Sequence, residues 1–269
     1  MASLICTVRD CRLPLARQDR RMHCANGHSF DVASAGYVNL LQPQERRSKQ
    51  PGDSAVAVAA RRRLHDRGVS APSLRAIAKM IQASADDIVA DAGCGDGFYL
   101  GSLAQETGFS AHGIDISVPA ITAAARRYPA CQWVVANADR FVPYADGSFS
   151  IVLSVTARMN GPEFARILRP DGRLLVAIPA PDDLIEVRGT GRDRVASTIE
   201  TFSGHFKLLE HKRVTSASDL DAEAIQDIRH SIYRPLGREV DVVTQVTFSL
   251  DLLLFAPEPV IKGPGAIIV

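Results

Sequence analysis

A short apolar run followed by a glycine-rich turn constrains the fold of this chain more than any other stretch. Residues 88–100 read IVADAGCGDGFYL, in which the apolar run ends at Asp91 and glycines follow at positions 93, 95 and 97. Glycine is needed where the backbone takes dihedral angles closed to other residues, or where a ligand lies against the main chain. The pattern predicts a strand, a tight turn that cradles a ligand, and a helix that begins at Phe98.

Two carboxylates beside the glycines indicate the charge of that ligand. A dinucleotide-binding turn places a pyrophosphate at the N-terminus of the following helix, and Asp91 and Asp96 would repel it here. A cationic ligand fits better. The DxGxGxG pattern resembles motif I of class I S-adenosylmethionine methyltransferases, whose methyl donor carries a sulfonium and an ammonium group. A glycine-rich turn in some other α/β protein remains the alternative.

Strands and helices alternate after the turn, which predicts a doubly wound parallel α/β sheet. In such sheets the ligand lies over the carboxyl ends of the strands. Asp115 ends the second strand about twenty residues after the glycines, where a carboxylate can accept both ribose hydroxyls. Asp139 follows the third strand and would accept from an adenine amino group, with Asn137 nearby. Each aspartate alone is equally consistent with capping a helix or turn. The expected strands are 88–92, 111–116, 132–137, 149–155 and 172–178, with helices at 98–106, 118–128 and 162–168.

The pattern changes after Phe202. A segment that reads FKLLEHKRV, a helical stretch near 219–230 and a run VTFSLDLLLF suit the antiparallel strands that close a methyltransferase sheet. The tail 256–269 contains proline and glycine and is expected to be irregular. The fold class expected is therefore a seven-stranded Rossmann-like methyltransferase sheet.

Three of the five cysteines lie in the first 24 residues. Cys6 and Cys11, with Cys24 and His28, form two pairs of soft ligands that can converge on one zinc ion, although the first spacing is wider than usual. So few large apolar residues stand near them that a metal cross-link would explain how this segment folds. Four protein ligands leave no open position, which predicts a structural zinc. His23 is a competing ligand, and reduced cysteines in a flexible arm are the metal-free alternative.

These features, taken in series, resemble the RlmA-type family of large-subunit ribosomal RNA guanine-N1 methyltransferases. The resemblance rests on the cysteine and histidine pairs, HSFDVASAGYVNLL at 28–41, PGDSAVAVAARRRLHDRG at 51–68 and the glycine turn. It implies S-adenosylmethionine as cofactor and a guanine N1 in a 23S ribosomal RNA hairpin near the macrolide-binding exit tunnel as target. The cofactor-binding residues expected are Asp91, Gly93, Gly95, Asp96, Gly97, Tyr99, Leu100, Asp115, Ile116, Asn137 and Asp139.

The chain is expected to divide into a zinc-binding domain at 1–36, a linker with a bridging helix at 37–70, and a methyltransferase domain at 71–269. Asp53 or Ser54 would cap the helix expected near 55–66. Six cations lie close together at Arg46, Arg47, Lys49 and residues 61–63. They predict contacts with RNA phosphates, and a solvated helix face is the alternative.

Guanine N1 carries a proton at neutral pH, so its methylation needs a base or stabilisation of the guanine anion. Asp182 and Asp183, after the fifth strand, are the candidate bases, with loop solvation as the alternative. The chain departs from the family pattern at residues 156–158, which read Thr-Ala-Arg in place of an aromatic residue followed by Ala-Pro. It also has Ser70, or Val69 under a shifted alignment, in place of a tyrosine. These departures keep two alternatives open, a small-molecule methyltransferase and a non-catalytic relative.

The composition of the chain limits the kinds of partner that it is expected to bind. A net charge of +1 and 46% hydrophobic residues indicate neither disorder nor a strongly basic nucleic-acid protein. The chain has no apolar run long enough to span a membrane and no secretory signal pattern, which predicts a cytoplasmic protein without a membrane partner. Ribosomal RNA is the expected partner, and a homodimer is a possible assembly.

Overall fold

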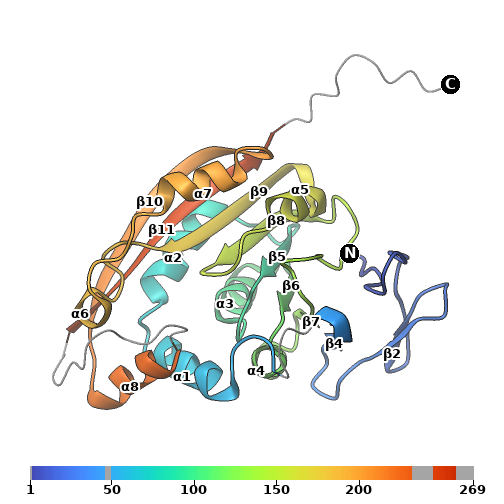
Figure 1. The fold of residues 1–269 in the computed structure, drawn as a ribbon, viewed down its shortest axis with the longest axis horizontal. Helices are drawn as coiled ribbons and strands as arrows, with labels where there is room; N and C mark the ends of the chain where they lie inside the picture. Colours follow the sequence, from blue (N-terminus) through green and yellow to red (C-terminus); the bar gives the residue numbers. More distant parts are fainter. Residues whose placement is uncertain (1, 46–49, 232–244, 259–269) are drawn as a thin grey trace.

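The computed structural model describes residues 2–45, 50–231 and 245–258, and its centre is one mixed sheet (Figure 1). The eight strands lie in the order β10-β11-β9-β8-β5-β6-β7-β4. All neighbours from β9 to β4 run parallel, while β11 is antiparallel to both β9 and β10. The strands are β4 (Val38–Asn39), β5 (Ile88–Ala92), β6 (Ser110–Asp115), β7 (Gln132–Val135), β8 (Phe149–Val155), β9 (Leu168–Pro179), β10 (Phe206–Asp219) and β11 (Gln245–Pro257).

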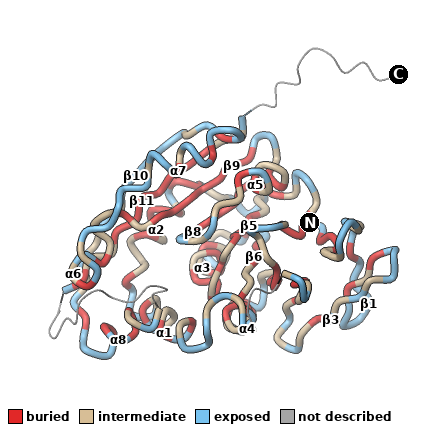
Figure 2. The backbone as a smooth tube through the Cα atoms, viewed as in Figure 1, coloured by how far each residue is buried: buried red, intermediate tan, exposed pale blue. Residues whose placement is uncertain are grey.

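Helices cover both faces of the sheet, because the central strands are apolar on both sides. One face packs against α2, α3 and α4 in a single apolar cluster, and the other packs against α5, α7 and the N-terminal segment. Figure 2 shows the buried central strands and the exposed outer strand β10. The helices are α1 (Ala55–Asp66), α2 (Ala71–Ile81), α3 (Phe98–Thr107), α4 (Val118–Arg127), α5 (Gly161–Ile167), α6 (Ile185–Arg188), α7 (Val195–Phe202) and α8 (Ala222–Ser231), with a 3-10 turn at Pro43–Glu45.

The expected alternation is confirmed, and its methyltransferase part has the seven strands predicted. The strands expected at 88–92 and 149–155 have those bounds, and the two C-terminal strands form the expected antiparallel pair. The eighth strand, β4, was not expected, because a two-residue pairing with β7 leaves no periodicity in the sequence. Helix α2 was also missed. The part of the tail from residue 259 onward lies outside the described residues.

The N-terminal segment folds as a small three-stranded sheet of β1 (Ala16–Gln18), β2 (Arg21–His23) and β3 (Ser29–Asp31). It adjoins the large sheet through β4 and through a bridge between Leu4 and Tyr144. Its buried side chains belong to the same apolar cluster as one face of the large sheet. Burial against the large sheet therefore contributes to holding this segment in place.

Helix α1 begins where the sequence predicts, because the Ser54 hydroxyl accepts from the Ala57 amide. It packs mainly against α8 and α4. Two of the arginines that are expected to contact RNA phosphates are engaged within the chain, because the guanidinium groups of Arg61 and Arg63 pair with Asp53 and Asp227. Residues 46–49 of the predicted cation cluster lie outside the described residues. No helix in the described ranges is both long and apolar enough to cross a membrane.

Candidate cofactor and zinc sites

The glycine turn joins β5 to α3 at the point where the sheet order reverses, with β6 on one side of β5 and β8 on the other. All three glycines have positive φ, between 55° and 87°. A Cβ on Gly97 would lie 2.4 Å from the Trp133 ring, and one on Gly93 would lie 2.4 Å from the Ala157 Cβ. Above Gly95, by contrast, nothing lies closer than the Arg61 guanidinium at 3.7 Å. Two of the glycines are therefore required by packing, whereas at the middle one a Cβ would only touch the Arg61 guanidinium.

Two buried carboxylates flank the glycines of the turn in sequence, and each has an oxygen without a hydrogen-bond partner among the described residues. They are Asp91 Oδ1 and Asp96 Oδ2, on side chains that are almost completely buried. Burial, with the nearby Asp115 charge, raises the pKa of Asp91 to about 8. Burial also raises the pKa of Asp96, against the opposing charge of Arg61. Unpartnered buried carboxylates are costly, and a cationic ligand in contact with them would offset that cost. The residues fit S-adenosylmethionine better than a nucleotide pyrophosphate.

Asp115 ends β6 beside the turn, as predicted. Its Oδ2 accepts from the Gly95 amide at 2.9 Å and its Oδ1 from the Ser117 amide at 2.8 Å. Each oxygen keeps a second lone pair, so a ribose diol can still bind. Ile116 is partly buried beside Gly52, whose Cβ, if present, would lie 2.9 Å from it. The loop that precedes α1 therefore closes over the end of β6.

The loops after β7 and β8 are tied together at the edge of the same site. Asn137 Oδ1 accepts from the Asp139 amide, and the Asn160 side-chain amide donates to the Asp139 carbonyl. The Asp139 carboxylate, predicted to meet adenine, lies 3.2 Å from Arg158 Nε at the surface. This ion pair was not expected, and it involves a residue at which the chain departs from the family pattern.

The remaining predicted residues lie around the start of α3 and the end of β9. Tyr99 is partly buried, and burial with the charge of Asp183 raises its pKa to about 12. Leu100 is fully buried in the core beneath the turn. Asp183 accepts from the Ser249 amide at 3.0 Å, while Asp182 Oδ1 is buried without a partner among the described residues. The structure thus gives Asp183 a structural hydrogen bond within electrostatic reach of the site.

Sequence reasoning missed one side chain at this site. His65 on α1 stacks on Phe98 with ring centroids 4.1 Å apart, and its Nε2 lies 3.9 Å from Asp96 Oδ1. Its Nδ1 is 2.7 Å from the Ser70 hydroxyl. Burial lowers the pKa of His65 to about 3, so the imidazole is neutral at neutral pH. His65 could not be recognised from the sequence, because a single histidine within a helix belongs to no motif.

The predicted zinc ligands do converge. The ligand atoms of Cys6, Cys11, Cys24 and His28 all lie within 4.8 Å of one another. Cys6 Sγ and Cys24 Sγ are each 3.4 Å from His28 Nδ1, and Cys11 Sγ is 3.7 Å from Cys24 Sγ. Three thiolates and one imidazole are a typical donor set for structural zinc. His23, the competing ligand, is not part of the cluster.

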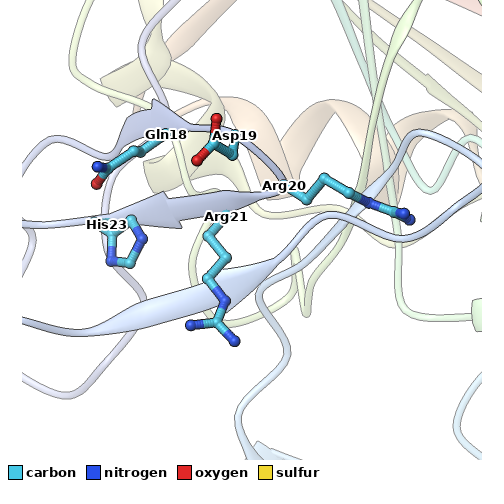
Figure 3. Close-up of a pocket in the computed structure, with 5 residues that line it drawn as sticks. All are labelled: Gln18, Asp19, Arg20, Arg21 and His23. Atoms are coloured by element: carbon cyan, nitrogen blue, oxygen red, sulfur yellow. The ribbon is translucent and has the colours of Figure 1, made fainter.

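The three-stranded sheet β1–β3 and the cluster of three cysteines and His28 together form a zinc module, and a pocket of about 480 Å³ lies on its β1–β2 hairpin. Figure 3 shows its lining, in which Arg20 and Arg21 extend in different directions from the hairpin. The Arg21 guanidinium pairs with Asp31 at 3.1 Å. The hairpin therefore presents exposed polar groups beside the zinc cluster, as a nucleic-acid contact requires.

Two family models match the chain. A zinc-ribbon model described as "RlmA, N-terminal" matches residues 5–49, and a model described as "Methyltransferase domain" matches residues 89–172. Their boundaries contain the cysteine cluster and the glycine turn respectively.

Similar proteins agree with these matches. The chain is 38% identical over 230 residues to the 23S rRNA (guanine(748)-N(1))-methyltransferase of Streptomyces fradiae, and the alignment covers 80% of each chain. It is 30% identical, over 82% of each chain, to a Bacillus subtilis protein provisionally named 23S rRNA (guanine-N(1)-)-methyltransferase. Among solved structures, a chain from the complex of the Haloferax volcanii Trm112 methyltransferase activator with a methyltransferase matches 77% of this chain and 99% of its own. Its TM-score is 0.52 at 21% identity, which supports the fold.

Proposed function

Because the chain belongs to the RlmA-type family of 23S rRNA (guanine-N1)-methyltransferases, we propose that it transfers a methyl group from S-adenosylmethionine to N1 of a guanine in 23S ribosomal RNA. One observation carries the proposal. A cluster of three cysteines and a histidine and a glycine turn bordered by unpartnered buried carboxylates occur in one chain. The first is typical of a structural zinc module, and the second suits a cationic methyl donor.

Each part of the site has a proposed role toward the cofactor. Bound S-adenosylmethionine would supply an electrophilic methyl group on its sulfonium. Asp91 and Asp96 would hold its positive charges, Asp115 would accept from the ribose hydroxyls, and Asp139 with Asn137 would face the adenine. For Asp139 this requires that Arg158, which is 80% exposed, release the carboxylate. Exposed ion pairs contribute little stability, so the exchange is inexpensive.

The acceptor step adds a methyl group to N1, leaves the neutral thioether product, and releases the N1 proton. Asp183 is the proposed proton acceptor, since burial raises its pKa above the usual range for an aspartate. Its hydrogen bond to the Ser249 amide would hold it in place. Asp182 is the second candidate. Replacing each in turn with asparagine separates the two, because only loss of the base should lower kcat while cofactor affinity stays unchanged.

The module boundaries 1–36, 37–70 and 71–269 are part of the proposal. The zinc module would present its β1–β2 hairpin, with exposed Arg20, to the ribosomal RNA hairpin. A cytoplasmic location follows from a ribosomal substrate. A homodimer stays a prediction, which light scattering of the pure protein can test.

Transfer of a tritiated methyl group to 23S ribosomal RNA, unmodified at the target, tests the proposed function. Mass analysis of the labelled nucleoside should find 1-methylguanosine, and the Asp115→Asn variant should label more slowly at limiting cofactor. Label at another position of the base would refute the guanine-N1 assignment. Label that enters only small molecules of a cell extract would favour the small-molecule alternative, which the altered residues 156–158 suggest. Cofactor binding without any transfer would favour a non-catalytic relative.

A further inference from the structure

A positively charged surface lies between α2 and β10, and β10 is at the opposite edge of the sheet from β4 and the zinc module (Figure 1). A groove of about 330 Å³ lies between α2 and β10, and cationic residues from both elements line it. Arg75 and Lys79 come from α2, and Lys212 comes from β10. All three residues are exposed. We propose that this α2–β10 groove binds the phosphate backbone of the RNA substrate, an inference that rests on the proposed function.

The α2 wall carries its charges at a cost. Arg75 and Lys79 are four positions apart, so they are neighbours on one helix face and repel each other. Neither makes an ion pair with any described carboxylate, whereas Arg61, Arg63 and Arg67 on and after α1 are all paired. An unpaired i,i+4 pair of cations beside a groove is the arrangement that a polyanion would stabilise.

The β10 wall is held so that Lys212 faces α2. Lys212 pairs in register with Leu252, which is buried in the same apolar cluster as α2. Its neighbours His211 and Arg213 point to the other face, where both bind the buried Asp251 carboxylate at 2.8–2.9 Å. That anchor fixes the strand on both sides of Lys212. Its ammonium is consequently directed toward the α2 cations.

The groove lining is close in sequence to a residue of the proposed cofactor site. Pro72, in the groove lining, is two residues from Ser70, whose hydroxyl meets His65 beside the glycine turn. If the target base of an RNA strand entered the site, the phosphates of the adjoining nucleotides could contact Arg75, Lys79 and Lys212 in the groove. Glu210 shares the sheet face of Lys212, two residues away, and is the nearest opposing charge on that strand. Three cations against one carboxylate leave the surface positive.

The salt dependence of RNA binding tests this inference. A protein that neutralises Z phosphates of a single strand loses affinity with a slope of about −0.7Z in log K against log salt. The triple variant Arg75→Ala, Lys79→Ala, Lys212→Ala should bind 23S ribosomal RNA more weakly and reduce the slope by about 2. The matched control Arg126→Ala, Arg169→Ala, Lys207→Ala removes the same charge outside the groove. Cofactor affinity, measured by calorimetry, should be unchanged in both variants.

The outcomes separate this inference from the proposed function. If the wild-type chain methylates 23S ribosomal RNA but the groove variant keeps the slope and affinity of the control, the groove proposal is wrong and the function stands. If the wild-type chain does not bind RNA, both fail. If RNA binding is unchanged but light scattering shows that the groove variant has lost self-association, the groove is a protein interface instead.

Discussion

Replacing Asp91 with asparagine should abolish the pH dependence of S-adenosylmethionine binding. Burial and the nearby Asp115 charge raise the pKa of Asp91 to about 8, so the carboxyl is protonated at neutral pH in the free protein. A cation in contact favours the ionised form, and binding should therefore release one proton below about pH 8. Affinity should rise tenfold for each pH unit. Between pH 6 and 7.5 the gain is roughly 30-fold, or about 2 kcal/mol.

The imidazole of His65 does not titrate in this window. The pKa of His65 is lowered to about 3 by burial and the nearby arginines, so its imidazole stays neutral. Calorimetry in buffers of different ionisation enthalpy counts the proton directly. The control is Asp146→Asn, which removes an exposed carboxylate from a loop before β8. A wild-type protein that releases no proton near pH 7, or an Asp91→Asn protein that still does, would refute a direct contact between this carboxylate and the cation.

In the cofactor-free protein, the raised pKa of Asp91 should make the free energy of unfolding depend on pH. A pKa raised above the unfolded value of 3.8 means that the folded state holds the proton more tightly. Stability contributed by this proton is complete below about pH 4 and is lost as pH rises toward about 8. Asparagine does not ionise, so the Asp91→Asn protein should not lose this stability as the pH rises. Without cofactor, the variant should therefore be more stable than the wild type at about pH 8 in denaturant unfolding, provided that the amide fits the same space.

Three further predictions concern single side chains. Asp115→Asn removes an acceptor for the Gly95 amide and for the ribose, and calorimetry should show cofactor binding weakened by about 1–3 kcal/mol. In denaturant unfolding, Gly97→Ala should destabilise the protein by about 1–3 kcal/mol more than Gly147→Ala. Both glycines have positive φ, but only at Gly97 would the added methyl group clash with Trp133. Equal losses of stability would contradict the packing argument. Cys24→Ser should release zinc and expose residues 1–36 to protease while cofactor affinity is mostly retained, and loss of both together would refute a separate structural role for zinc.

The glycine turn and the strands around it could be predicted because their determinants are local. Positive φ at Gly93 and Gly97, the end of β5 at Ala92 and the position of Asp115 all follow from short-range pattern. The sequence also predicted a cluster of three cysteines and a histidine, which converge in the structure, since paired cysteines and a histidine have few other uses in so small a segment. What it did not provide was the reason for each glycine. Trp133 and Ala157, which exclude a side chain at Gly97 and Gly93, are distant in sequence.

The arginines of α1 illustrate what local pattern cannot decide. Arg61 to Arg63 look alike in sequence, and free cations beside a zinc module suggest RNA. In the structure Arg63 binds both oxygens of Asp227, which is buried and 164 positions away. A buried carboxylate needs such a partner, so the pair joins α1 to α8. Conversely, the cations that remain unpaired on α2 belong to a helix that the sequence did not reveal.

The predicted outcome for Cys24→Ser depends on how the zinc module adjoins the sheet. Leu4, Met22 and Cys24 pack in the same apolar cluster as Tyr144, so loss of the metal would expose surface shared with the catalytic domain. Two modules in one core are expected to lose stability together. The loss of stability should be largest near β4, which is the edge strand of the sheet. Strands β6 and β7 lie between β4 and β5, the strand that leads into the glycine turn. The pairing of β4 with β7 covers two residues, near the carboxyl end of β7. The loop that carries Asn137 and Asp139 follows directly, whereas the amides of Gly93 and Cys94 in the glycine turn donate to the Ile114 carbonyl of β6. Any loss of cofactor affinity on zinc removal should therefore come from the adenine end of the site, and adenosine should lose affinity by the same factor as the whole cofactor.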